Sequence, residues 1–200
     1  MSGTQVCTLL VCDEVSFPNK LTVGQPLPSQ QFLWEGDAEW YQVPVTAGQH
    51  LFAFAEKTQA WGTLLDIADG HLPTQGGFSN SDHAVEHTVQ ATGFAYVRVL
   101  GWGPSAQSCT LLVCDEVSFP NKLTVGQPLP SQQLLWEGDS MWYQVVLPQS
   151  SPLVCQATKS GSWDAELRVK QGALPISQPY SSSSGTGDLG VAFLTSAAAT

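Results

Sequence analysis

Positive charge is scarce in this chain of 200 residues. Its 7 Lys and Arg residues stand against 17 Asp and Glu residues, which gives a formal net charge of −10. The average field of such a chain repels a phosphate backbone, and no cluster of Lys or Arg reverses that field locally. The composition therefore excludes nucleic acid as a partner. The acidic surface either attracts cations or a basic partner, or serves solubility alone.

Long apolar runs are also missing. No run approaches the roughly 18 residues of a membrane-spanning helix, so we expect no transmembrane segment. The first residues, MSGTQVCTLLV, lack the basic region and the long apolar core of a signal peptide. The chain nevertheless has 42% hydrophobic residues and 7 Trp, which indicates a folded protein.

What the chain does contain is a long internal repeat. The segment from Cys7 to Val43 returns 102 residues later as Cys109 to Val145, with 34 of 37 positions identical. The differing pairs are Phe32/Leu134, Ala38/Ser140 and Glu39/Met141. Beyond Val43 the identity falls, although the same offset still pairs Trp61 with Trp163. A fixed period of this kind predicts two domains on one plan, each of about a hundred residues.

No catalytic set is visible, so we expect a protein that is not an enzyme. All four His residues lie before the second copy, whereas a duplicated catalytic site is not expected to lose every His in one copy. They are His50, His71, His83 and His87. The Ser residues lie outside any Gly-x-Ser-x-Gly motif, and no Gly-rich phosphate loop is followed by Lys.

Four of the five Cys residues form two copies of a Cys-x4-Cys pair. The five are Cys7, Cys12, Cys109, Cys114 and Cys155. In an extended strand this spacing places the two thiols on opposite faces, roughly 16 Å apart, which is too far for a disulfide within the strand. The first interpretation is that they are small buried hydrophobic residues. Disulfides with partners elsewhere, including across chains, stay open, and no zinc-binding spacing is present.

Short stretches of strand-forming residues alternate with turn residues along the chain. We expect strands at residues 7–11, 40–45, 51–56, 64–68, 84–90 and 94–100, and a short edge strand around Lys20 to Val23. Residues 75–83 are rich in turn formers and are expected to form a loop. This spacing without helical periodicity predicts an all-β fold of antiparallel β-sandwich type.

The order of these pieces, from Gln25 to Val113, resembles a known family. The matching features are a Gly-Gln-Pro-Leu lead-in, Trp-Glu-Gly-Asp before Trp-Tyr-Gln-Val, Ala-Gly-Gln before Leu-Phe-Ala-Phe, the Leu-Leu-Asp-Ile and Phe-Ala-Tyr-Val-Arg-Val strands, and the closing Cys-Thr-Leu-Leu-Val. They resemble the bacterial pre-peptidase C-terminal (PPC) domain, a jelly-roll-like β-sandwich often appended to secreted proteases. The resemblance implies two tandem domains and an extracellular or cell-surface location. A subunit of an organellar complex is the alternative.

The resemblance also sets the phase of the repeat. It implies that Cys109 to Val113 ends the first domain, so that residues 12–113 form one sandwich and residues 114–200 form a second that lacks its last strands. Residues 1–11 are then a leading strand equivalent to the last strand of a repeat. One hypothesis is that this strand, formed by Cys7, Thr8, Leu9, Leu10 and Val11, fills the vacant place in a neighbouring copy. The alternatives are a fragment of a longer array, or closure by residues 185–200.

Two further groups of residues are candidates for binding. Asp66, Asp69 and Asp82 offer oxygen ligands, and some members of the resembled family bind Ca²⁺, although the spacing matches no calcium loop and exposed turn carboxylates are the alternative. No other cofactor is expected. Trp102 has no counterpart in the second copy, and its Gly-Trp-Gly-Pro stretch is expected to be a loop. It is a candidate contact for a glycan or a partner protein, or it packs against the neighbouring domain.

Together these features predict a non-catalytic structural protein of tandem β-sandwich repeats. Its expected role is protein–protein association or self-assembly in a larger complex, through strand exchange. The alternative is a carbohydrate- or protein-binding accessory module of a secreted enzyme.

Overall fold

The computed structural model of this chain describes residues 11–33, 35–57, 62–73, 83–102, 107–130, 132–135, 139–147, 152–161, 163–176 and 179–194. These residues form β-strands and include no helix. The fold is therefore all-β, as the strand pattern predicted.

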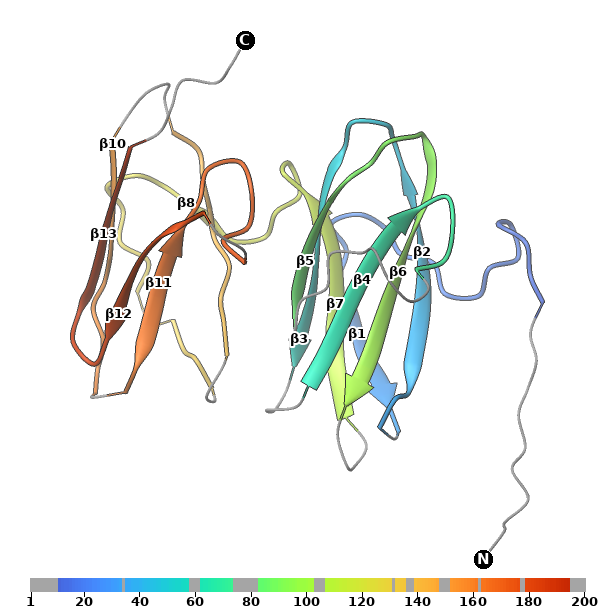
Figure 1. The fold of residues 1–200 in the computed structure, drawn as a ribbon, viewed down its shortest axis with the longest axis horizontal. Helices are drawn as coiled ribbons and strands as arrows, with labels where there is room; N and C mark the ends of the chain where they lie inside the picture. The colour runs from blue at the N-terminus through green and yellow to red at the C-terminus, as the bar shows by residue number, and fades with distance from the viewer. Residues whose placement is uncertain are drawn as a thin grey trace, which may run out of the picture.

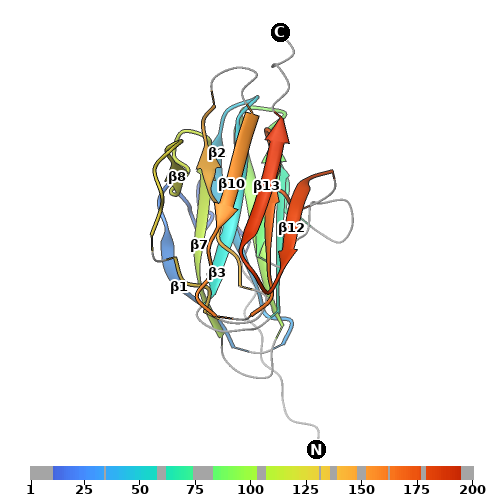
Figure 2. The ribbon, with the colours of Figure 1, turned by 90° about the vertical axis from the view of Figure 1, so that its left-hand side faces the viewer.

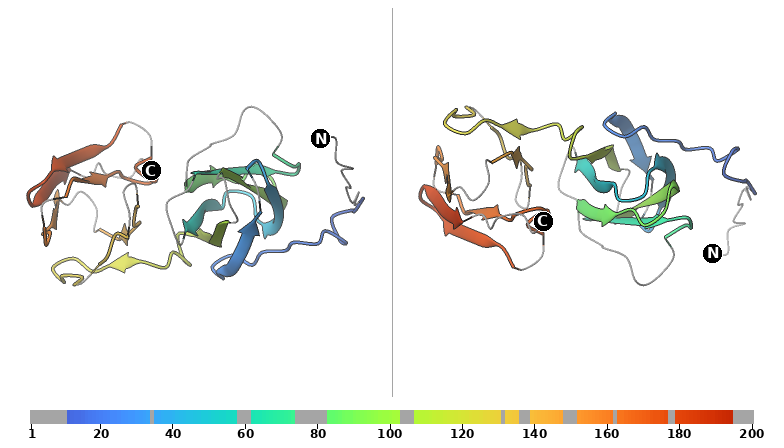
Figure 3. Two further views of the ribbon diagram at one scale, coloured as in Figure 1. Left: turned by 90° about the horizontal axis from the view of Figure 1, so that it is seen from below. Right: turned by 90° about the horizontal axis from the view of Figure 1, so that it is seen from above.

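The first half, residues 11–115, is a β-sandwich. Its strands are β1 (Leu27–Phe32), β2 (Ala38–Val45), β3 (His50–Lys57), β4 (Gly62–Asp69), β5 (Ala84–Thr88), β6 (Gly93–Trp102) and β7 (Gln107–Asp115). They form two antiparallel sheets, ordered β1-β7-β3-β5 and β2-β6-β4. Figures 1 and 3 show the two sheets stacked face to face.

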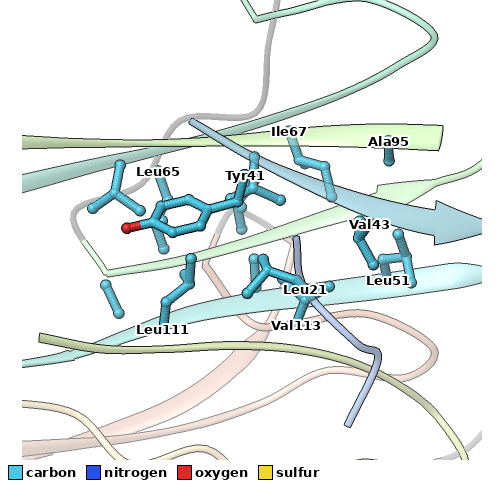
Figure 4. Close-up of a cluster of buried hydrophobic side chains, with 14 of the residues drawn as sticks. Leu21, Tyr41, Val43, Leu51, Leu65, Ile67, Ala95, Leu111 and Val113 are labelled. Atoms are coloured by element: carbon cyan, nitrogen blue, oxygen red, sulfur yellow. The ribbon is translucent and has the colours of Figure 1, made fainter. Parts of the chain in front are cut away.

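The hydrophobic core lies between these two sheets. Leu51 and Val113 come from one sheet, whereas Tyr41, Val43 and Leu65 come from the other, and all five are buried (Figure 4). The pattern follows from strand geometry, because alternate residues of a strand point to the same face. Burial raises the pKa of Tyr41, and its hydroxyl donates a hydrogen bond to Gln30 at 2.9 Å.

The second half, residues 116–194, has shorter strands in two-stranded sheets. The strands are β8 (Lys122–Leu123), β9 (Gln144–Val145), β10 (Pro152–Ala157), β11 (Ala165–Val169), β12 (Ser181–Gly185) and β13 (Leu189–Leu194). β10 pairs antiparallel with β13 and β11 with β12, whereas β8 and β9 are parallel. In Figure 2, β10, β13 and β12 lie side by side.

The two halves meet on the outer face of the first sheet. Phe52 and Phe54 of β3 contact the Phe119 ring edge-on, with ring centroids 5.5 and 5.6 Å apart. The Glu86 carboxylate of β5 accepts a hydrogen bond of 2.6 Å from the backbone N–H of Leu174. Phe119 and Leu174 therefore attach the second half to the face formed by β3, β5 and β7.

The predicted strands at 40–45, 51–56, 64–68 and 94–100 lie within β2, β3, β4 and β6, and β5 covers most of the predicted strand at 84–90. The structure differs from the predicted strands in two places. The expected edge strand around Lys20 to Val23 is a single parallel bridge between Lys20 and Gln42. By contrast, β1 was not predicted, because Pro28 argues against a central strand, whereas β1 lies at the sheet edge.

The second copy departs from the first in a way that the repeat did not predict. Residues 129–134 have the sequence LPSQQL, close to the LPSQQF of β1, yet the described part of this segment contains no strand. The serine run 181–184, in contrast, forms most of β12. The boundaries at residues 11, 113 and 200 and the jelly-roll connectivity stay predictions.

Candidate functional site

The inner face of β10 is the place where the second half differs most from the first. With the offset of 102 residues, β10 corresponds to β3. Leu51, Ala53 and Ala55 of β3 are buried in the sandwich core. Their counterparts in β10, Leu153, Cys155 and Ala157, are only half-buried. The inner row of β10 is therefore incompletely covered.

The reason lies in the neighbours of each strand. β3 is hydrogen-bonded on both sides, to β5 and to β7. Among the described residues, β10 pairs with β13 alone. β13 stands beside β10 as β5 stands beside β3, so the edge of β10 away from β13, called the free edge below, corresponds to the edge that β7 occupies. In Figure 2 the chain around β8 runs on this side of β10.

Apolar side chains of the 129–134 segment are exposed. Phe32 of β1 is 1% exposed, whereas Leu134 at the same repeat position is 41% exposed. Leu129 at the start of the segment is 49% exposed. Both positions are open for the same reason, because in the first half β7 lies between β1 and β3 and covers the equivalent residues.

Two glycines at equivalent positions of the repeat, Gly24 and Gly126, show the same difference between the halves. Gly24 and Gly126 both have φ of 79°, a conformation that favours glycine. A Cβ on Gly24 would lie 2.6 Å from Cβ of Ser118, in the turn that follows β7. A Cβ on Gly126 would have no neighbouring heavy atom within 4 Å. The second half thus lacks, among its described residues, both a counterpart of β7 and a counterpart of the turn after it.

A free strand edge has a defined chemistry. It presents backbone N–H and C=O groups that pair with any extended segment of suitable side chains. Here one flanking row consists of Leu153, Cys155 and Ala157, and burial raises the pKa of the Cys155 thiol, which keeps it neutral. The arrangement therefore suits an apolar strand.

A second feature lies at the junction of the halves. A cavity of about 250 Å³ is bounded by the aromatic side chains of Phe54, Phe119 and Trp142. Ser140 and Met141, two of the three positions that differ between the copies, also line it. The Ser140 hydroxyl is buried and has no hydrogen-bond partner among the described residues.

The predicted interface residues are only partly described. Cys7, Thr8, Leu9 and Leu10 lie outside the described residues, whereas Val11 is 86% exposed. The loop expected at Trp102 is corrected, because Trp102 is the last residue of β6 and its backbone pairs with Gly62 of β4. Its side chain is not described. Their proposed roles stay predictions.

The three calcium candidates are dispersed. Asp66 is buried in β4 and forms an ion pair with Arg98 of β6. Asp69 ends β4 and accepts hydrogen bonds from His87 and from the backbone N–H of Gln90. Asp82 lies outside the described residues. Within the described ranges, no group of three His, Cys, Asp or Glu side chains lies close enough to hold a metal ion.

The thiols of the repeat follow the strand geometry. Cys109 lies in the sandwich core and Cys114 on the outer face of the same strand, so the two point to opposite faces as the spacing predicted. Burial raises the pKa of each to about 12. The described cysteines, which also include exposed Cys12 and half-buried Cys155, form no disulfide with one another.

The sequence predicted a spare strand at residues 7–11, but it did not predict which residues would receive that strand. The β10 row and the 129–134 segment were recoverable from the 102-residue offset, because they correspond to the two strands that flank β7. This correspondence was not seen from the sequence, because β1 itself was not predicted as a strand.

No family model matches the chain, and no curated protein matches it. One similar solved structure is a periplasmic inhibitor of g-type lysozyme from Aeromonas hydrophila, 18% identical over 49% of this chain and 98% of that chain, with a TM-score of 0.37. Another is the pre-peptidase C-terminal domain of a collagenase from Bacillus anthracis, 14% identical over 48% of this chain and 92% of that chain, with a TM-score of 0.38. The latter is a domain of the family that the sequence resembles. In the described part of the chain, no helix has the length and apolar character needed to cross a membrane.

Proposed function

We propose that this chain is a non-catalytic assembly protein that associates with other proteins by strand addition at the free edge of β10. A single observation carries the proposal. Nearly the same six residues form strand β1 when β7 lies beside them, whereas in residues 129–134, with no strand beside them, the described positions form none. The second half therefore needs a strand that its described residues do not supply.

The energetic argument favours an apolar extended segment. Burying one Leu or Val side chain contributes roughly 1.5–3 kcal/mol, and a strand at the free edge would also satisfy the backbone groups of β10. The segment from Cys7 to Val11 is suited to this place, because its sequence is identical to that of Cys109 to Val113 in β7. This identity supports strand exchange between copies. We place this assembly outside the cell or at its surface.

Sedimentation velocity of the full chain over a range of concentrations tests this function. We expect concentration-dependent association that is lost when residues 1–11 are deleted. A matched pair sharpens the test: Leu9→Asn removes an apolar side chain at the position of core residue Leu111, whereas Thr8→Asn changes a residue on the opposite face. Loss with Leu9→Asn and retention with Thr8→Asn supports strand addition. A full chain that stays monomeric at all concentrations contradicts it.

The junction cavity supports a second candidate function, a binding module for a carbohydrate. A pyranose ring presents C–H groups that pack on aromatic faces and hydroxyls that hydrogen-bond to polar groups. Trp142 and the unpartnered Ser140 hydroxyl offer both kinds of contact. Glycan-array binding that is abolished by Trp142→Ala and retained with Trp40→Ala, the equivalent position in the first copy, would support this function. Equal binding by both variants would contradict it.

A further inference from the structure

We infer that residues 7–11 of one copy lie between β10 and the 129–134 segment of the next copy, antiparallel to both, with Val11 directly opposite Cys155. This inference rests on the proposed function and specifies the partner segment and its register. It makes each copy the donor to one neighbour and the acceptor for another.

The register is transferred from β7 by the 102-residue offset. In the first half, Val113 lies opposite Ala53 of β3, and Leu111 lies opposite Leu27 of β1. Val11 and Leu9 are the counterparts of Val113 and Leu111, whereas Cys155 and Leu129 are the counterparts of Ala53 and Leu27. Val11 therefore meets Cys155 on one side, and Leu9 meets Leu129 on the other.

The side chains of this register match the face that needs covering. Cys109, Leu111 and Val113 point into the sandwich core and are fully buried. Cys7, Leu9 and Val11 repeat that row, and they would face the half-buried row of Leu153, Cys155 and Ala157. The apolar row of the donor strand would thus pack against the apolar row of β10, as the rows of β7 and β3 share one core in the first half.

The turn that follows the strand is already formed at the donor end. The Asp115 carboxylate accepts a hydrogen bond of 2.8 Å from the Ser118 backbone N–H, and Asp13 and Ser16 make the same bond at 2.8 Å. In the first half, Gly24 leaves room for Ser118, whereas Gly126 has open space beside it. A donor segment in this register would bring Ser16 to Gly126 as Ser118 lies at Gly24.

The donor and acceptor must belong to different copies. The described chain around Val11 lies on the side of the first sandwich away from the second half, in both Figure 1 and Figure 3. The donor segment and the free edge are different surfaces, so the contact is heterologous. Contacts of this kind extend into open rows or close into rings.

A disulfide tests the register. Directly opposite residues of antiparallel strands have Cα atoms roughly 4.5–5.5 Å apart, within the range that a disulfide spans. The experiment uses the full chain with Cys7→Ala and Cys12→Ala, so that these two thiols do not take part in the reaction. Val11→Cys in this background, incubated with oxidised glutathione, is expected to yield a ladder of linked oligomers on a non-reducing gel. The bond to Cys155 is verified by peptide mass spectrometry.

Two controls make the result specific. Adding Cys155→Ser should abolish the ladder, and Leu10→Cys in place of Val11→Cys should give at most one tenth of the product, because that side chain points to the opposite face. Absence of the ladder in a chain that still associates in sedimentation overturns the register and leaves the proposed function standing. A monomer with an internal bond to Cys155 overturns the exchange between copies, and a full chain that never associates overturns both proposals.

Discussion

Phe32 and Leu134 occupy the same position in two nearly identical segments, yet Phe32 is sealed in a core and Leu134 lies open to solvent. The neighbouring residues of the sequence are the same in both copies. The difference arises from β7, which pairs with β1 through Phe32 opposite Gln107. Tertiary pairing, and not local sequence, therefore decides whether this segment is a strand.

This asymmetry predicts unequal effects of the same substitution. Phe32→Ala should lower the free energy of unfolding by about 3 kcal/mol or more, because it leaves a cavity in a packed core. Leu134→Ala should change it by less than about 1 kcal/mol in the monomer, since the side chain is already exposed. Urea unfolding of a dilute chain measures both, and equal losses would contradict the account.

The cysteines should differ in reactivity at pH 8. Cys12 is exposed, whereas burial raises the pKa of Cys109 and Cys114 to about 12. Because the thiolate is the reactive form, iodoacetamide should label Cys12 within minutes and leave the two buried thiols unlabelled until the chain unfolds. Peptide mapping after timed quenching checks this. Rapid labelling of Cys109 in the native protein would show that β7 is not held as described.

The ion pairs of the two halves should contribute unequally to stability. Asp66 and Arg98 are largely buried, so Asp66→Asn leaves an uncompensated guanidinium and should cost roughly 3 kcal/mol. Glu166 and Arg168 of β11 form a more exposed pair, and Glu166→Gln should cost less than about 1 kcal/mol. Thermal unfolding in low and high salt compares them. A larger loss with Glu166→Gln would refute this ranking.

The turn after β7 should make stability depend on pH. Burial opposes ionisation of Asp115, but hydrogen bonds from Ser118 and Gln49 outweigh it and lower the pKa of this carboxyl. A lowered folded-state pKa contributes stability above the unfolded value near 3.8, and this contribution disappears as the pH falls through the folded value. Asp115→Asn should therefore cost up to about 1 kcal/mol at pH 7 and less at pH 2. Urea titrations at the two pH values provide the comparison, with Asp13→Asn as the exposed counterpart.

The sequence predicted the central strands of the first half well. β2, β3, β4 and β6 alternate or run apolar in the expected way, and their partners lie within the same hundred residues. β1 was missed because Pro28 and Ser29 reduce strand propensity, and the edge position that tolerates them is a property of the sheet.

The second half was less predictable from the sequence. Five of the six residues are the same in both copies, so strand propensity hardly distinguishes residues 129–134 from β1. The serine run of β12 pairs with β11 in a register that composition alone does not indicate. The predicted spare strand and the free edge of β10 become a single candidate site only when the pairing of β7 is known.

The first sandwich begins and ends at one corner. Gly24 donates a hydrogen bond of 2.7 Å to the carbonyl of Val113, and Leu21 donates one of 2.8 Å to Gln42. The segment that leads into the first sandwich is thereby fastened to the strand that leads out of it.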